Sequence, residues 1–163
     1  MHIGILSRNP KLYSTRRLMA AARARGHQAR IIDTTSVAVH IGRDGHSRVE
    51  PQVLVDGIPG LAAPIDLPPL DAIIPRIGAS VTFYGLAVVR QYEAAGVPTT
   101  ASSEAIARSR DKLHSLQLLA QARLPIPRTA VVARPEALFA AVEAVGGLPA
   151  VVKLIHGTQG RGV

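Results

Sequence analysis

The sequence predicts an open α/β domain over residues 1–115, followed at 116–163 by the beginning of a second, α+β unit. An apolar run, "MHIGIL", is followed by a helical pattern and a second apolar run, "ARIID". This βαβ order is typical of a parallel sheet with right-handed crossovers. A later strand–helix pair, "DAIIP" and "TFYGLAVVRQYEA", repeats the pattern. The two prolines of "RLPIPRTAVVA" then indicate a linker into a new unit.

The first domain is expected to begin with a strand and a helix that starts at Ser14 and runs through about Arg25. Serine is a favoured N-cap residue, and Gly26 suits the end of the helix. Two β-prone runs around "RDG" predict a hairpin, and the proline-rich stretch "AAPIDLPPL" predicts an irregular segment. The remaining expected elements are strands at 29–33 and 71–74 and helices at 82–95, from Ser102 or Ser103, and from Asp111.

The second unit is expected to contain two strands flanking one helix. The strands are predicted at 129–133 and 149–155, and the helix from Pro135 to Gly146–Gly147. Because a piece of this size cannot bury both of its faces, it is expected to be incomplete by itself.

Composition excludes several classes of protein. There is no cysteine, so neither disulfides nor thiolate metal sites are expected. No secretory signal pattern or run of about 20 apolar residues occurs, which favours a cytoplasmic protein without a membrane partner. The net charge is +8, with aromatic residues at 3 % and no tryptophan. Because aromatic side chains that could stack on bases are few and the basic residues are dispersed, a nucleic-acid partner is disfavoured. The positive charge is also compatible with an acidic small substrate or with a basic surface that has no specific partner.

The familiar catalytic motifs are missing. The sequence contains no GxxxxGK[ST], no GxSxG and no HExxH, and the first strand is not followed by GxGxxG. No catalytic nucleophile and no metal ligand is therefore assigned.

Three cations are the candidate binding residues. Lys153 lies on an apolar run directly before "GTQGRG", and backbone amides of such a loop can approach phosphate oxygens. Lys112 lies at a helix N-terminus, where an anionic ligand would offset its unfavourable interaction with the helix dipole. Arg76 follows a strand at its carboxyl end, where ligands bind in open α/β sheets. Alternatively, each cation faces solvent or, for Arg76, pairs with a nearby acid.

Four segments in order resemble the RimK-type ATP-grasp ligases, which are ribosomal-protein L-glutamate ligases. These segments are "ILSR…LYS", "DAIIPRIGASVTFYG", "ARSRDKLHSLQLLA" and "PAVVKLIHGTQGRGV". The resemblance covers nearly the whole chain, and residues 36–68 depart from it most. It implies a pre-ATP-grasp (Rossmann-like) domain followed by the first part of an ATP-grasp domain.

The resemblance also implies a reaction and its site. ATP would phosphorylate the C-terminal carboxylate of a small-subunit ribosomal protein, or of a growing glutamate chain. The amine of L-glutamate would then attack the acyl phosphate. Mg²⁺ would be required, with its ligands expected beyond residue 163, so 1–163 is expected to be inactive alone. The oligomeric state stays open. The residues that match the family's ATP site are Lys112, Lys153, Gly157, Thr158, Gln159, Gly160 and Gly162, and Arg76 is the candidate for substrate.

Two other functions remain open at this point. One is a sibling ATP-grasp ligase that acts on a small acid. The other is a non-catalytic module that uses its basic surface to bind an acidic partner or RNA.

Overall fold

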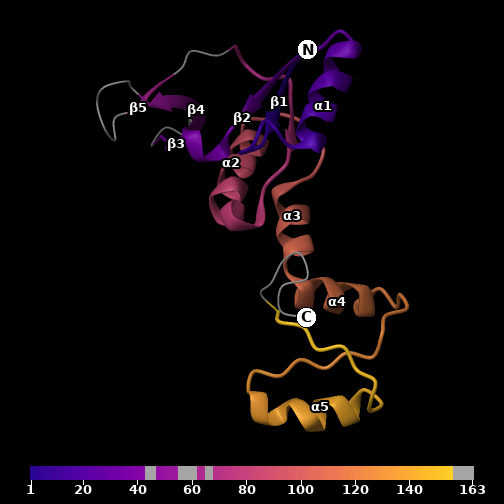
Figure 1. The fold of residues 1–163 in the computed structure, drawn as a ribbon. Coiled ribbons are helices and arrows are strands. Elements are labelled where there is room, and N and C mark those ends of the chain that lie inside the picture. The colour runs from indigo at the N-terminus through magenta and orange to yellow at the C-terminus, as the bar shows by residue number, and fades with distance from the viewer. Residues whose placement is uncertain (43–46, 55–61, 65–67, 156–163) are drawn as a thin grey trace. The chain divides into compact units, whose positions relative to one another are not determined.

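The computed structural model describes residues 1–42, 47–54, 62–64 and 68–155. The chain divides into two compact units, Met1–Ala107 and Arg108–Val163, which are described separately (Figure 1). The domain boundary expected after residue 115 lies within helix α4 (Lys112–Gln121) and stays a prediction.

A parallel sheet forms the centre of the first unit. Its strands are β1 (His2–Leu6), β2 (Gln28–Ile32) and β6 (Ala72–Pro75), in the order β2-β1-β6. Both neighbours pair with β1 in parallel, and helix α1 (Tyr13–Ala24) connects β1 to β2. The predicted βαβ opening and the α/β fold class are therefore confirmed.

The start of α1 differs from its prediction. Leu12 occupies the cap position and makes no side-chain cap hydrogen bond, so the expectation that Ser14 caps the helix is wrong. Ser14 lies in the first turn, where its Oγ accepts a hydrogen bond from Arg76 Nη2 at 3.0 Å. Arg76 follows β6, so the hydrogen-bond partner of the Ser14 hydroxyl comes from a distant part of the sequence. Gly26, with φ +75°, follows the helix as expected.

A separate antiparallel sheet is inserted between β2 and β6. Strand β3 (Val37–Ile41) pairs with β4 (Ser47–Leu54), and β4 pairs with β5 (Ala62–Pro64). The predicted hairpin is confirmed, although its "RDG" turn lies outside the described residues. The expectation of an irregular segment throughout 62–70 is wrong at β5, because the edge of β4 offers that short strand a ladder partner.

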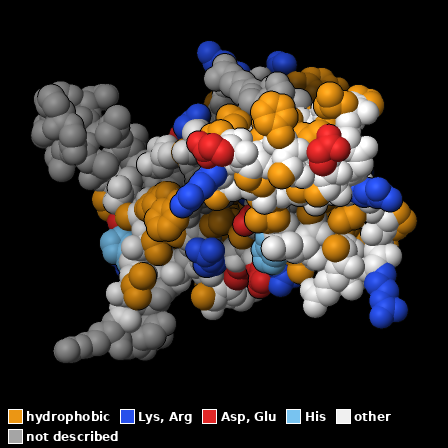
Figure 2. All heavy atoms as spheres, turned by 90° about the horizontal axis from the view of Figure 1, so that it is seen from below, with side chains coloured by type: hydrophobic (Ala, Val, Ile, Leu, Met, Phe, Trp, Pro, Cys, Tyr) orange, Lys and Arg blue, Asp and Glu red, His pale blue; other side chains and the backbone are white. Residues whose placement is uncertain are grey.

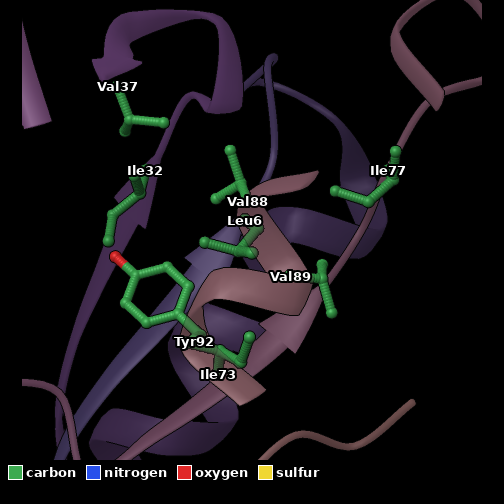
Figure 3. Packing of buried hydrophobic residues seen from close by; sticks show 8 residues of the cluster. All are labelled: Leu6, Ile32, Val37, Ile73, Ile77, Val88, Val89 and Tyr92. Carbon is green, nitrogen blue, oxygen red and sulfur yellow. The ribbon is translucent and has the colours of Figure 1, made fainter. Parts of the chain in front are cut away.

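Helix α2 (Thr82–Ala94) covers one face of the parallel sheet and completes the core. Leu6 and Ile73 from the sheet and Val88 and Val89 from α2 are each 0 % exposed and belong to one cluster (Figure 3). Burial raises the pKa of the Tyr92 phenol, and the Arg30 guanidinium partly opposes that rise. The other members of the cluster are Ile32, Val37, Ile77 and Tyr92.

We expect Gly85→Ala to destabilise the first unit. In most helices this change is worth about 1 kcal/mol of stabilisation, because alanine has the higher helix propensity. Here a Cβ on Gly85 would lie 2.5 Å from Ile77 Cγ2 and 3.1 Å from Ile77 Cδ1. Overpacking against a buried, β-branched side chain costs about 1–3 kcal/mol, so the net effect is a loss of stability.

Gly78→Ala is the matched control for that substitution. Gly78 has φ −75°, and a Cβ there would meet no heavy atom within 4 Å. Urea unfolding should show a lower midpoint for Gly85→Ala and an unchanged or higher midpoint for Gly78→Ala. Equal midpoints in the two variants would contradict the close approach of α2 to Ile77.

Two side chains accept hydrogen bonds from the N-terminal end of helix α3 (Ser103–Arg110). Ser102 Oγ accepts a hydrogen bond from the Ala105 amide at 3.1 Å. The Glu93 carboxylate accepts from the Ser103 amide at 2.8 Å and from Ser103 Oγ at 2.6 Å. The helix N-terminus is therefore held by a carboxylate from the last turn of α2, which is favourable for the helix dipole.

The second unit is helical in its described part. Helix α4 begins after Asp111, whose Oδ1 accepts a hydrogen bond from the His114 amide at 2.9 Å, as predicted. A 3₁₀ turn (Pro135–Ala137) and helix α5 (Leu138–Ala144) confirm the helix expected from Pro135. The predicted strands at 129–133 and 149–155 are wrong in this structure: no residue of either described segment is assigned to a strand. A strand needs a neighbour to supply ladder hydrogen bonds, and none is assigned within the described part of this unit.

Apolar side chains of the second unit remain on its surface. Phe139 of α5 is 84 % exposed. Within the predicted strand at 149–155, Val151 is 74 % exposed and Leu154 is 62 % exposed, so this apolar segment does not form part of a buried core. Hydrophobic side chains, with separate charged groups between them, are visible on the face of the molecule drawn in Figure 2.

Candidate functional site

Lys112 lies beside the backbone next to Lys153, although 41 positions separate the two lysines in the sequence. Lys112 is the first residue of α4, directly after the Asp111 cap. Its Nζ donates a hydrogen bond to the carbonyl oxygen of Leu154 at 3.2 Å, and Leu154 directly follows Lys153. The structure thus places one predicted phosphate-binding cation beside the backbone that carries the other.

Lys153 is exposed, lies outside any helix or strand, and lines a cavity of about 720 Å³ in the second unit. The cavity lies among α4, α5 and residues 127–132 and 147–155, and most of its lining is apolar. The other polar lining residues are Arg128 and Thr129. Apolar walls with a few polar groups are the usual composition of a small-molecule site.

The glycine-rich loop cannot be placed against these lysines. Gly157, Thr158, Gln159, Gly160 and Gly162 lie outside the described residues. Their assignment to a phosphate-binding loop therefore stays a prediction.

Arg76 belongs to the first unit and lies at the carboxyl end of β6. Its amide donates to the Leu6 carbonyl at 2.8 Å, so the backbone continues the β1–β6 pairing by one step. Its guanidinium is exposed, and Nη2 donates to Ser14 Oγ at 3.0 Å. Among the described residues no carboxylate forms a salt bridge with Arg76, since the recorded salt bridges both involve Glu50.

Sequence reasoning missed the partners of Arg76. Ser14 and Arg76 meet where β1, β6 and the first turn of α1 converge, and buried Ser7 and Thr15 join their hydroxyls there at 3.0 Å. The signal that could have found them is topological, because residues after parallel strands gather at one edge of the sheet. That edge presents hydroxyl and guanidinium groups, which together can bind a carboxylate.

The described residues contain no cluster of three or more His, Asp or Glu side chains that could hold a metal ion. In the same part of the chain, no helix is both long enough and apolar enough to cross a bilayer.

Family comparisons agree with the division into two units. Residues 1–106 match the RimK PreATP-grasp domain, and residues 109–163 match the RimK-like ATP-grasp domain. The chain belongs to the RimK family. The predicted family and the predicted order of a pre-ATP-grasp domain and an ATP-grasp domain are confirmed.

Individual members of the RimK family extend this result. The chain is 51 % identical over 163 residues to a probable alpha-L-glutamate ligase 1 of Pseudoalteromonas atlantica. It is 50 % identical to a probable alpha-L-glutamate ligase of Pseudomonas aeruginosa. These matches cover 100 % of this chain and 50 % of each relative, so the chain spans about half the length of these curated relatives.

A solved structure shares the fold. The crystal structure of a RimK domain ATP-grasp protein from Sphaerobacter thermophilus superposes with a TM-score of 0.65 at 22 % identity. The superposition covers 95 % of this chain and 50 % of the other.

Proposed function

We propose that the full-length protein carrying this chain is an ATP-dependent carboxylate–amine ligase. In its reaction L-glutamate is added to the C-terminus of a small-subunit ribosomal protein. The observation that carries the proposal is the hydrogen bond from Lys112 Nζ to the Leu154 carbonyl. It places one lysine beside the backbone that follows the other, within the segment that matches the ATP-grasp domain.

A pair of lysines suits a nucleoside triphosphate because its phosphates carry several negative charges. Charge-assisted hydrogen bonds from lysine to phosphate oxygens are among the stronger polar contacts in proteins. In phosphoryl transfer the protein contributes mainly by positioning the reactants and stabilising charge. Lys112 and Lys153 are assigned these tasks, and the loop of Gly157, Thr158, Gln159, Gly160 and Gly162 is assigned the remaining phosphate contacts.

The proposed reaction proceeds in two balanced steps. A carboxylate oxygen of the acceptor attacks the γ-phosphorus of ATP, which forms an acyl phosphate and releases ADP. The amine of L-glutamate then attacks the acyl carbon and expels phosphate, which leaves an amide and a proton. Mg²⁺, when bound, would neutralise phosphate charge. Arg76 is assigned to an incoming carboxylate, held with the help of the Ser14 hydroxyl.

A ligation assay with the full-length protein tests this function. Purified small-subunit ribosomal proteins and a panel of small carboxylic acids are offered with ATP, Mg²⁺ and L-glutamate. We expect mass spectrometry to show glutamyl residues added to a ribosomal protein, with ADP formed in equal amount. Addition to a small acid alone would identify a sibling ligase instead. The absence of any glutamate-dependent ADP formation would overturn the proposal.

A further inference from the structure

The chain changes from α3 to α4 at a single residue, directly before Lys112. Helix α3 ends at Arg110 and α4 begins at Lys112, so Asp111 alone separates them. Asp111 has extended backbone angles, φ −90° and ψ 100°, which interrupt the helical path. The place of Lys112 therefore depends on the hydrogen bonds that hold this junction.

Two hydrogen bonds to Asp111 close the first turn of α4 around Lys112. The Asp111 carboxylate accepts from the His114 amide at 2.9 Å, and the Asp111 carbonyl accepts from the Ser115 amide at 2.9 Å. Because Lys112 lies between the bonded residues, its backbone is enclosed by both bonds. The carboxylate also offsets the unfavourable interaction of a lysine with the positive end of the helix dipole.

The Ser115 hydroxyl connects the two helices across the junction. Ser115 Oγ donates to the carbonyl oxygen of Arg108 at 2.7 Å. Arg108 lies in the last turn of α3, where carbonyls have no partner within their own helix. Both ends of this bond belong to the second unit, so it fixes the first turn of α4 within that unit.

The far end of the Lys112 side chain makes a contact that needs this backbone position. Its Nζ donates to the carbonyl oxygen of Leu154 at 3.2 Å. A lysine side chain is a flexible four-carbon stem, and such a stem does not define by itself where its ammonium lies. A fixed first turn of α4 reduces the region that the ammonium can reach.

We propose that Asp111 and Ser115 are positioning residues, which hold the first turn of α4 where the Lys112 ammonium reaches the phosphates of ATP. This inference rests on the proposed function, since it takes ATP to be the ligand of Lys112. Neither side chain is assigned a contact with ATP. Their removal lowers the fraction of molecules in which Lys112 is in place, and the apparent affinity falls with that fraction.

ATP binding to the full-length protein tests the inference. Isothermal titration calorimetry is carried out with Mg²⁺ and without glutamate or acceptor. Asp111→Ala should raise the dissociation constant of ATP about three- to tenfold, and by no more than Lys112→Ala does. Asp111→Asn can accept the same amide hydrogen bond without the charge, so it should bind ATP at least as tightly as the unmodified protein.

Ser115→Ala separates positioning from helix stability. Alanine has a higher helix propensity than serine, so α4 by itself gains stability while the bond to the Arg108 carbonyl is lost. We expect ATP binding to weaken about two- to fivefold, whereas greater stability of α4 alone would not weaken it. This variant also decides the matter if circular dichroism shows that Asp111→Ala is unfolded.

A double variant shows whether Asp111 acts through Lys112. In a protein that already carries Lys112→Ala, adding Asp111→Ala should cause no further loss of ATP affinity, because no ammonium remains to be positioned. The lowering of the urea midpoint by Asp111→Ala should be similar in both backgrounds. A role in stability alone would instead give the same loss of ATP affinity with and without Lys112.

Asp33→Ala is the matched control. Asp33 caps the 3₁₀ turn Thr34–Ser36 in the first unit, and its Oδ1 accepts from the Thr35 amide at 2.9 Å. The substitution removes the same kind of cap and the same charge, and it should leave ATP binding unchanged.

Three results would overturn the inference. They are unchanged ATP binding in both Asp111→Ala and Ser115→Ala, an equal loss in Asp33→Ala, and an undiminished effect of Asp111→Ala when Lys112 is absent. The ligation assay is read separately from these titrations. A protein that binds ATP with this pattern but transfers no glutamate would refute the proposed function and leave the positioning role intact.

Discussion

Replacing Lys153 by alanine in the full-length protein weakens ATP binding by about 10- to 100-fold. The substitution removes one charge-assisted hydrogen bond to a phosphate, worth about 1.5–3 kcal/mol. The change should be visible as a higher dissociation constant in isothermal titration calorimetry, and ligation should slow with it. Lys112→Ala should act in the same direction with a smaller effect.

The double variant distinguishes one shared phosphate site from two independent cations. Lys112 Nζ contacts the carbonyl of Leu154, so the two lysines should act on the same bound phosphates. Residues that share a ligand show non-additive effects, and the loss in Lys112→Ala/Lys153→Ala should differ from the sum of the single losses.

Arg134→Ala is the control for the lysine variants. Arg134 is an exposed cation of the same unit that precedes the 3₁₀ turn at Pro135 and does not line the cavity. It should leave ATP binding unchanged. An unchanged dissociation constant in Lys153→Ala, or an equal loss in Arg134→Ala, would remove Lys153 from the nucleotide site.

Replacing Leu6 by alanine lowers the free energy of unfolding of the first unit by about 2–5 kcal/mol. Leu6 is 0 % exposed and packs between the parallel sheet and α2, in the cluster that contains Ile73 and Val88. Truncation to alanine removes buried methyl groups and leaves a cavity that close-packed neighbours cannot fill completely.

Tyrosine fluorescence makes this measurement specific to the first unit. The 163-residue chain has no tryptophan, and its tyrosines, Tyr13, Tyr84 and Tyr92, all lie within Met1–Ala107. Urea unfolding of the chain followed by this signal should show a lower midpoint for Leu6→Ala. Ile41→Ala, at a position that is 83 % exposed on β3, is the control and should shift the midpoint little. Equal midpoints for the two variants would contradict the core assignment.

Several elements of both units could be predicted because their signals are local. The apolar run of β1, the glycine after α1 and the Asp111 cap of α4 each act through neighbours in sequence. The same holds for the four sequence segments whose order indicated the family before any contact was known.

Contacts between distant residues were decided by the tertiary structure. Ser14 suits a helix cap by its residue type, yet it accepts a hydrogen bond from Arg76, 62 positions away. Likewise, β5 forms in a proline-rich stretch because β4 offers an edge, whereas residues 129–133 and 149–155 have strand-like patterns and no assigned partner. Alternation of apolar residues favours an extended chain, but ladder hydrogen bonds require a second strand in register.

For the candidate site, too, some features followed from the sequence and others only from the folded structure. Residue types and spacing by themselves determined that Lys112, Lys153 and Arg76 are candidates for binding anions. Only the folded chain brought Lys112 to the carbonyl of Leu154 and Arg76 to the first turn of α1. The physical reason is that charge and hydrogen-bonding capacity belong to single side chains, whereas a binding site depends on distances that packing alone determines.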